Sequence, residues 1–262
     1  MTAWETVGFG VTSTGAFLAM TGYTGQSGTV RNTALGGNVA LQALWASNAT
    51  AGQVRVRSPR LHDNVQGIRY DSIAATPLNL LGRRPFTKLV PQDQLTVEFN
   101  GTNTEVDAAF AYINYASLPG SDGCWSTWSM VQPRMVDIMT QQVVNTAVAC
   151  ANNWSPGLAI NTTTDLMKAN TDYALLGYVA SVAAGAIAIQ GPDTGGLKVG
   201  GPCSINPIET REWFCEMDWL SDEPGIPIIN SANKGGTFLF VGATGATYTG
   251  NVDLLFAELA AG

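Results

Sequence analysis

The chain has 262 residues, with 20 Asp and Glu against 13 Lys and Arg, and an isoelectric point near 4.6. Because nucleic acids are bound through clustered cations on the protein, we expect no specific nucleic-acid binding from this acidic chain. Only 13% of the residues are charged and 29 are glycine, which favours many short strands joined by turns over solvated helices.

The N-terminal segment MTAWETVGFGVTSTGAF lacks the basic and continuously apolar regions of a secretory signal, and Glu5 interrupts it. We therefore expect the protein to be made and used without Sec export. In the first part of the chain, strand signals separated by Gly, Asn, Asp and Pro clusters predict seven or eight strands. These signals span residues 7–13, 15–22, 38–46, 52–58, 67–74, 95–101 and 107–116.

The segment 54–57 alternates between apolar and charged residues. Successive side chains of a strand point to opposite faces, so we expect Val54 and Val56 inside a sandwich and Arg55 and Arg57 on its outer face.

A single histidine, His62, follows this strand with Asp63 beside it. Adjacent residues of an extended segment point to opposite sides, and no Ser or Cys lies in a recognisable nucleophile turn. We therefore expect a loop hydrogen bond here rather than catalysis, and we predict no catalytic residues and no enzymatic activity.

Charge is unevenly distributed along the chain. Residues 1–121 contain eight basic and seven acidic side chains, whereas residues 122–262 contain five basic and thirteen acidic ones. Two interpretations of the arginines in the first part stay open: ion pairs between protomers that set their register, or ordinary surface charge, since exposed pairs contribute only roughly 0–1 kcal/mol. These arginines are Arg55, Arg57, Arg60, Arg69, Arg83 and Arg84.

We predict a linker at residues 121–134. We predict a helix at residues 134–151, because five apolar side chains fall near one helical face. Those five are Met135, Ile138, Met139, Val143 and Ala147. The cysteines are too few and too irregularly spaced for a disulfide framework or a zinc site, so we expect buried or half-buried thiols and no metal or cofactor. They are Cys124, Cys150, Cys203 and Cys215.

Residues 174–191 (ALLGYVASVAAGAIAIQG) form the most apolar passage, and residues 40–59 (ALQALWASNATAGQVRVRSP) have nearly the same layout. The second passage carries Arg55 and Arg57, which a lipid-spanning helix tolerates poorly, and the first falls short of about 20 apolar residues. We therefore predict two strands joined by a tight turn around Ala184 and Gly185, with Ile187 and Ile189 facing inward like Val54 and Val56.

The most charged passage, residues 209–223, interleaves acids with aromatic residues. Its spacing does not follow a calcium-binding loop, so we expect a long loop or short helix whose aromatic side docks while its acids face water, rather than an ion site. The acids are Glu209, Glu212, Glu216, Asp218, Asp222 and Glu223, and the aromatic residues are Trp213, Phe214 and Trp219.

A second match joins VDAAFA (residues 106–111) to VDLLFA (residues 252–257). Matched passages in the same order predict a duplication of one β-rich unit of about 120 residues. The chain would then consist of a first unit at residues 1–120, a linker at 121–134 and a second unit at 135–262.

On this doubled unit and its matched passages, the chain resembles the double-jelly-roll major capsid proteins of tailless icosahedral viruses, the adenovirus hexon and membrane-containing bacteriophage type. The resemblance implies an all-β fold of two tandem eight-stranded jelly-roll β-sandwiches with few short helices. It also implies that three chains form a pseudo-hexagonal homotrimer, and that trimers tile an icosahedral shell. The implied partners are other copies of the chain, penton or minor capsid proteins and, in some such viruses, an internal membrane; the implied location is the virion, after synthesis in the host cytoplasm.

Two other classes stay open. A tandem β-sandwich carbohydrate-binding protein or virion spike would use exposed aromatic residues beside Asp and Asn, and Trp125, Trp128 and Trp154 are candidates. A β-sandwich hydrolase is disfavoured by the single histidine and by the lack of paired catalytic carboxylates that can be placed.

Overall fold

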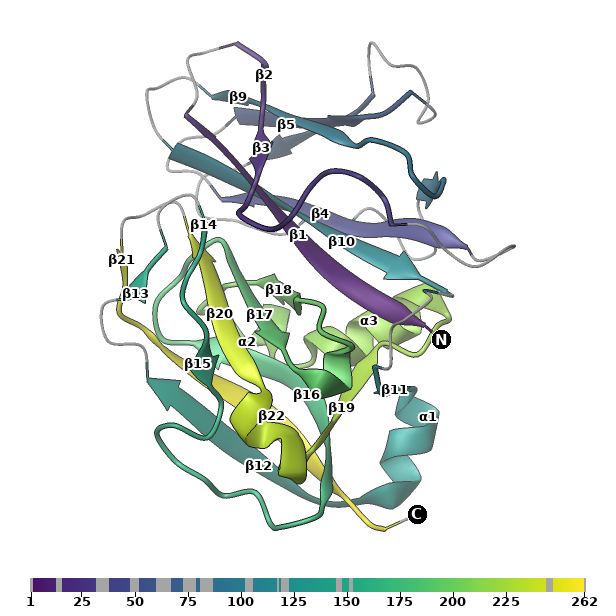
Figure 1. Ribbon diagram of the computed structural model, residues 1–262, viewed down its shortest axis with the longest axis vertical. Coiled ribbons are helices and arrows are strands. Elements are labelled where there is room, and N and C mark those ends of the chain that lie inside the picture. The colour runs from purple at the N-terminus through teal and green to yellow at the C-terminus, as the bar shows by residue number, and fades with distance from the viewer. Residues whose placement is uncertain are drawn as a thin grey trace.

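Strands dominate the fold and the few helices are short, as expected for an all-β protein. The computed structural model describes residues 2–12, 16–31, 38–47, 52–59, 67–72, 79–80, 87–101, 106–116, 118, 123–144, 148–150, 153–243 and 247–261. Figure 1 shows the main strands gathered in four layers, which we number sheets 1 to 4 from the top of that view to the bottom.

Sheets 1 and 2 come from the first part of the chain. Sheet 1 has the strand order β2-β9-β5-β6, and sheet 2 has the order β3-β1-β10-β4-β7, with β8 also paired to β4. Each predicted strand region contains a strand, and the region 15–22 is divided into two; the pattern did not predict β7 or β8. The bounds are β1 (Ala3–Thr12), β2 (Leu18–Ala19), β3 (Thr21–Gly22), β4 (Val39–Ser47), β5 (Gly52–Arg57), β6 (Ile68–Ser72), β7 (Asn79–Leu80), β8 (Thr87–Leu89), β9 (Thr96–Gly101) and β10 (Val106–Tyr115).

Sheets 3 and 4 come from the second part of the chain. Sheet 3 has the order β14-β20-β17-β18, with β15 also paired to β20, and sheet 4 has the order β11-β19-β16-β22-β12. A further pair, β13 with β21, stands apart from both. The bounds are β11 (Trp125–Ser126), β12 (Met135–Val144), β13 (Val148–Ala149), β14 (Asn153–Trp154), β15 (Leu158–Ala159), β16 (Asp172–Ala180), β17 (Ala186–Gln190), β18 (Val199–Pro202), β19 (Ile226–Asn230), β20 (Phe238–Ala243), β21 (Thr247–Tyr248) and β22 (Asn251–Leu259).

The helices are connectors of one to three turns: α1 (Trp128–Val131), α2 (Pro207–Thr210), α3 (Trp213–Ser221), η1 (Gln132–Arg134), η2 (Pro192–Thr194) and η3 (Ser231–Gly236). Pro207 occupies the first position of α2, and the Asn206 side chain accepts a hydrogen bond from the Ile208 N–H, so this end carries both common start signals. Within the described part of the chain, no helix is long and apolar enough to cross a membrane.

The predicted helix at residues 134–151 is wrong. Residues 135–144 form β12, which pairs antiparallel with β22 over nine residue pairs, and β13 comes next, while Ala147 lies outside the described residues. The same residues also carry a period of two, since Gln141 and Val143 are buried while Thr140 is exposed. Long-range pairing and this alternation outweigh the helical spacing of the apolar residues, which is a weak signal in a segment rich in β-branched side chains.

The two halves share one strand order. Sheet 2 places β1, β10, β4 and β8 side by side, and sheet 4 places β12, β22, β16 and β19 in the same sequence of positions. Sheet 1 (β2, β9, β5, β6) and sheet 3 (β14, β20, β17, β18) correspond in the same way. The order along the chain is identical in both halves, so each half is one copy of a two-sheet arrangement.

A β-bulge fixes how the copies align residue by residue. In β4, Gln42 has no partner opposite the step from Tyr112 to Ile113, and in β16, Leu176 has none opposite the step from Leu255 to Phe256. The predicted match of residues 40–47 to 174–181 places these two bulged residues at the same position, so it is confirmed. The predicted turn between the strands of residues 174–191 is also present, because β16 ends at Ala180 and β17 begins at Ala186.

The match of VDAAFA to VDLLFA is displaced by three residues. Counted from the bulge, Ile113 occupies the position of Phe256, whereas the letter match assigned that position to Phe110. An odd shift moves every side chain to the other face of a strand, so pairing and burial decide the register and shared letters do not.

Candidate functional site

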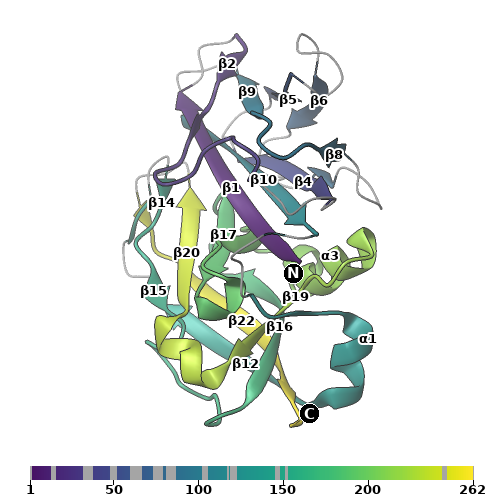
Figure 2. The ribbon, with the colours of Figure 1, turned by 45° about the vertical axis from the view of Figure 1, so that its right-hand side comes forward.

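The largest candidate site is the contact between sheet 2 and sheet 3, where the two halves of the chain meet (Figure 2). Aromatic side chains from sheet 2 and its border form a cluster with two tryptophans of the second half, and the ring centroids lie 4.9–5.9 Å apart. The cluster consists of Trp4, Tyr23, Trp45, Phe110, Tyr112, Trp154 and Trp213. Aromatic residues bury the largest apolar areas, so this cluster joins the halves firmly.

Glycines of the second half make room for these rings. A Cβ on Gly185 or Gly242 would lie 2.6 or 2.8 Å from the Phe110 ring, and one on Gly201 would lie 2.4 Å from the Trp213 ring. The Trp45 indole N–H also donates a hydrogen bond of 2.9 Å to the Gly185 carbonyl. A side chain at Gly185 or Gly242 would push the halves apart, whereas one at Gly201 would displace Trp213 within the second half.

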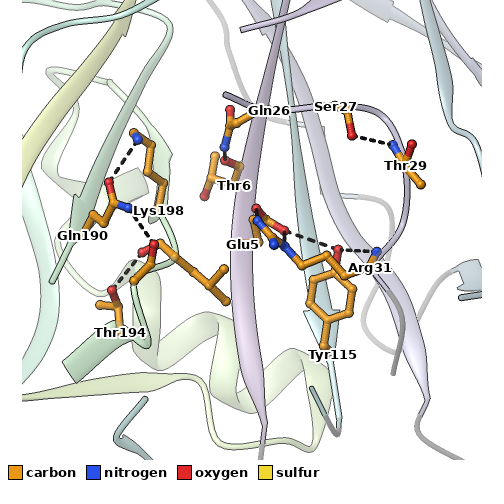
Figure 3. Close-up of polar contacts among 12 residues, drawn as sticks. Glu5, Thr6, Gln26, Ser27, Thr29, Arg31, Tyr115, Gln190, Thr194 and Lys198 are labelled. Carbon is orange, nitrogen blue, oxygen red and sulfur yellow. Dashed lines mark hydrogen bonds and ion pairs between the residues drawn. The ribbon is translucent and has the colours of Figure 1, made fainter. Parts of the chain in front are cut away.

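Hydrogen bonds complete the contact, and Figure 3 draws the one that the Gln26 side chain donates to the Thr6 carbonyl within the first half. The Thr6 N–H donates to the Lys198 carbonyl at 2.7 Å, and the Thr6 hydroxyl bonds both the N–H and the carbonyl of Gly200. The Gln26 side chain donates to the Thr6 carbonyl and accepts from the Trp154 indole at 2.8 Å. Backbone groups at this contact are thus paired across the two halves.

These contacts explain the apolar passage at residues 174–191. Ala188 faces away from the core of its own half and is fully buried, because its neighbour in β18 is Gly200, which β1 of the first half covers. The predicted inward positions, Ile187 and Ile189, are buried as well. The surface that covers Ala188 is therefore the first half of the same chain.

The corresponding outer face of sheet 1 is covered by no sheet of the described chain. Val54 and Val56 are fully buried, whereas Arg55 and Arg57 lie on the outer face, so that prediction is confirmed. Arg57 bonds Glu98 at 3.0 and 3.1 Å, and Arg55 bonds the same carboxylate. Burial acts to raise the pKa of Glu98, but the hydrogen bonds and charges of Arg57 and Arg55 outweigh it and hold that pKa below its ordinary value.

The arginines extend across this face. Arg55 lies over the Phe17 ring at 4.4 Å and Arg69 at 5.4 Å from the ring centroid, and Arg69 is exposed. Arg55 and Arg57 both form an ion pair with Glu98, so the open question of their ion pairs is answered in part by internal pairs. Arg60, Arg83 and Arg84 lie outside the described residues.

At the opposite end of the stack, the outer face of sheet 4 is apolar and acidic. Val136, Ile138 and Trp219 are 62%, 50% and 64% exposed, which is unusual for such large apolar side chains. A groove of about 570 Å³ runs along this face. Its walls include Trp128, Ile138, Leu176, Leu255 and Trp219, with Arg211, Glu212 and Asp218 beside them.

The acidic passage forms α2 and α3, which pack against β16. Trp213 and Phe214 are buried and dock as predicted, but Trp219 is exposed in the groove, contrary to that prediction. Burial raises the pKa of Asp218, although its carboxylate accepts N–H bonds from Trp128 and Gly225. Glu212, Glu216 and Asp222 are exposed, and among the residues described no group of three or more His, Cys, Asp or Glu is placed to hold a metal ion.

A smaller cavity of about 320 Å³ lies beside the bulge of β4. Gln42 is buried there, and neither its amide nitrogen nor its amide oxygen has a hydrogen-bond partner among the described residues. The Asn114 amide nitrogen is also without one, and Lys88 and Glu223 are among the other residues that line the cavity.

The remaining predicted residues fall into three groups. His62 and Asp63 lie outside the described residues. Of the tryptophans considered for sugar binding, Trp154 is buried in the contact between the halves, the Trp125 indole nitrogen is buried, and Trp128 is half-buried in the groove. All four cysteines are free thiols: Cys150 and Cys203 are buried, Cys215 is half-buried, and Cys124 is exposed, unlike the prediction.

No family model and no curated protein matches the chain. Among solved structures, the chain is similar to the STIV MCP, a viral major capsid protein, with 8% identity, a TM-score of 0.23 and coverage of 98% of this chain and 96% of that one. It is also similar to the PBSX exported protein XepA, with 9% identity, a TM-score of 0.19 and coverage of 94% and 87%. Similarity at this level carries no argument about function, which has to rest on the strand order and the surfaces of this chain.

Proposed function

We propose that this protein is a viral major capsid protein whose two halves are jelly rolls and whose homotrimers tile an icosahedral shell. The observation that carries the proposal is the doubled strand order. Each half pairs a first, eighth, third and sixth strand in one sheet and a second, seventh, fourth and fifth strand in the other, which is the order of a Greek-key jelly roll.

The stacking of the halves supports the same proposal. The four sheets form one row, so the two halves lie side by side with sheet 1 and sheet 4 at the two ends (Figure 1). Three such chains closed into a ring would place six similar units around one axis. That shape suits a flat hexagonal tile.

Catalysis is no part of the proposal. Within the described residues, the cysteines are poor nucleophiles, because burial raises the pKa of Cys203 and Cys215 to about 12. Arg55, Arg57 and Glu98 of the first half form internal ion pairs. We propose a structural protein of the virion that binds other copies of itself and minor shell proteins.

Mass and shape of the purified protein test the proposal. One chain has a mass of 27.6 kDa, so sedimentation at high protein concentration should show a species of about 83 kDa, three times that value. Negative-stain images of the same sample should show particles with a hexagonal outline. A protein that stays monomeric in sedimentation and shows no hexagonal outline would contradict the proposal.

Carbohydrate binding is the second candidate, and the exposed Trp219 beside Asp218 and Trp128 favours it. A sugar stacked in this groove would quench the fluorescence of Trp219. Glycan-array binding that Trp219→Ala abolishes, in a protein that remains monomeric, would favour this function over the capsid.

A further inference from the structure

The cavity of about 320 Å³ beside the bulge of β4 lies where both halves of the chain supply its walls. Sheet 2 contributes Gln42, Asn114 and Lys88, and the segment that follows α3 contributes Glu223. Pockets for small molecules measure about 300–1,000 Å³ and are common at the junction of two structural units. The size and the place of this cavity therefore suit a small molecule.

The amides on the sheet 2 wall have no partner within the described chain. Gln42 is fully buried, and Asn114 is only 4% exposed. Both amide atoms of Gln42 and the amide nitrogen of Asn114 lack a hydrogen-bond partner among the described residues. A buried polar atom that is left unpaired lowers stability, so these three atoms call for a partner from outside the chain. Because no hydrogen bond fixes the Gln42 amide, it can turn toward a molecule in the cavity.

The fold itself does not require polar residues at this place. The bulge and the strand pairs beside it align sheet 2 with sheet 4 residue by residue. The counterparts of Gln42, Asn114 and Lys88 in sheet 4 are Leu176, Ala257 and Ile228. The second half thus builds the same bulge and the same pairing with apolar side chains at all three positions. Local rules of stability are broken mainly at functional sites, so the polar residues of the first half indicate a bound molecule.

Two opposite charges also line the cavity without neutralising each other. Lys88 is exposed, Glu223 is half-buried, and neither forms an ion pair among the described residues. Hydrogen bonds fix the segment that carries the carboxylate. The Trp4 indole N–H donates to the Pro224 carbonyl at 2.8 Å, and the Glu223 N–H donates to the Ser221 hydroxyl at 3.2 Å. The cavity therefore offers one positive and one negative group to a ligand that carries both charges.

We propose that this cavity binds a small zwitterion that contains an amide group, of the size of a dipeptide. The ligand carboxylate would meet the Lys88 ammonium, and the ligand ammonium would meet the Glu223 carboxylate. The ligand amide would donate its N–H to the Gln42 carbonyl and accept from the amide nitrogens of Gln42 and Asn114. One molecule would then satisfy all three unpaired atoms and both charges. This site is independent of the capsid proposal, since it lies within a single chain.

Calorimetric titration of the full chain with glycylglycine tests the proposal, and we expect one site per chain. Gln42→Leu installs the residue of the second half and should raise the dissociation constant of glycylglycine about tenfold or more, because its hydrogen bonds are lost. Without ligand, the same variant should unfold at a higher temperature, since two unpaired buried atoms are removed. Gln94→Leu is the matched control: Gln94 is exposed and does not line the cavity, so the affinity should stay unchanged.

Two modified ligands separate the charged ends of the site. Glycylglycinamide lacks the carboxylate, and N-acetylglycine lacks the ammonium. Lys88→Met should weaken the binding of glycylglycine and leave that of glycylglycinamide unchanged. Glu223→Gln should weaken the binding of glycylglycine and leave that of N-acetylglycine unchanged. Equal losses for the parent and the modified ligand would overturn the assignment of these two residues.

Each remaining outcome also decides the proposal. An unsubstituted chain that binds no glycylglycine overturns it, because the cavity would then hold water alone. Binding that Gln42→Leu leaves unchanged overturns it as well, because the ligand would then lie elsewhere. If Gln42→Leu does not fold, as circular dichroism would show, Asn114→Ala takes its place and should weaken binding in the same way. A chain that stays monomeric and binds glycylglycine would contradict the capsid proposal and leave this site standing.

Discussion

Glu98 decides how the face of sheet 1 is charged. Its carboxylate accepts hydrogen bonds from Arg55 and Arg57, and only about 6% of the side chain is exposed to water. Loss of the carboxylate would remove the acceptor that two neighbouring guanidinium groups share. The alternation of Val and Arg in the sequence predicts this outer face, but Glu98 comes from a strand more than forty residues further on, and no local pattern shows which acid will pair with the arginines.

Glu98→Gln should lower the free energy of unfolding by about 1.5–3 kcal/mol at pH 7, because charge-assisted hydrogen bonds are lost. The pKa of Glu98 is lower in the folded protein than in the unfolded chain, so its stabilisation is present above about pH 4.5 and is lost as the pH falls through the folded pKa. Urea unfolding at several pH values checks this. The difference in free energy of unfolding between the unsubstituted chain and Glu98→Gln should become smaller below about pH 4.5. If that difference stays constant on acidification, the charged pair is not its cause.

Trp45→Phe removes one hydrogen bond across the two halves, together with part of a fully buried ring. Phenylalanine keeps much of the ring contact with Phe110 but cannot donate to the Gly185 carbonyl, which would remain buried without that partner. We expect the free energy of unfolding to fall by about 1–3 kcal/mol. Trp219→Phe is the control, because that side chain is largely exposed and should change stability by no more than about 0.5 kcal/mol. Equal effects from both substitutions in denaturant titrations would argue against the hydrogen bond.

Among the elements, β16 shows how a strand and a helix are fitted together. Gly177 lies beneath α2, and a Cβ there would meet the Arg211 and Thr210 carbonyl oxygens at 2.2 and 2.3 Å. These are backbone atoms and cannot swing aside. A glycine in the middle of an apolar strand is therefore required by the helix above it, a relationship that the sequence of the strand does not reveal.

Gly177→Ala should destabilise the protein by about 1–3 kcal/mol, since α2 must move away from β16. Gly235→Ala serves as the comparison: no described atom lies within 4 Å of its Cβ position, so stability should be unchanged or slightly raised. Differential scanning calorimetry of the two variants checks the prediction. If Gly177→Ala unfolds at the same temperature as the unsubstituted chain, the close approach of helix and strand is wrong.

Strands are predictable from this sequence where apolar and polar side chains alternate clearly, and elements are poorly predictable elsewhere. The strands at residues 39–47, 52–57 and 106–115 have clear alternation or apolar runs, and the prediction of each is confirmed. The prediction of a helix fails over residues 135–144, because the apolar residues there satisfy both periods and only pairing with β22 separates them. The contact between sheets 2 and 3 is not predictable at all, since it depends on which outer face carries glycines opposite rings.

For the whole molecule, the uneven distribution of charged residues along the sequence gives the two ends of the stack different charges. The first half carries the arginine face and the second half carries the acidic one, as its larger number of carboxylates indicates. A duplication explains the shared strand order. The matched sequence passages are enough to predict the duplication, although the match of VDAAFA to VDLLFA misaligns one strand by three residues.

Salt should therefore weaken the association of copies. Raising NaCl from about 0.05 to about 0.5 M screens the attraction between exposed charges, so the dissociation constant of the proposed trimer should rise. Sedimentation equilibrium at both salt concentrations measures the shift. Arg69→Glu should reduce this salt dependence, and a trimer that strengthens with salt would show that apolar burial alone drives the contact.

The aromatic cluster between sheets 2 and 3 also has a consequence for the kinetics of assembly. In a ring of six similar units, chains with one unit each would need six molecules to meet. In the proposed trimer the cluster would form during folding and fill two places at once, so half of the unit-to-unit contacts would be intramolecular and would not depend on dilution. The number of complete rings then rises with the third power of the free chain concentration instead of the sixth, and assembly can begin in a far more dilute solution.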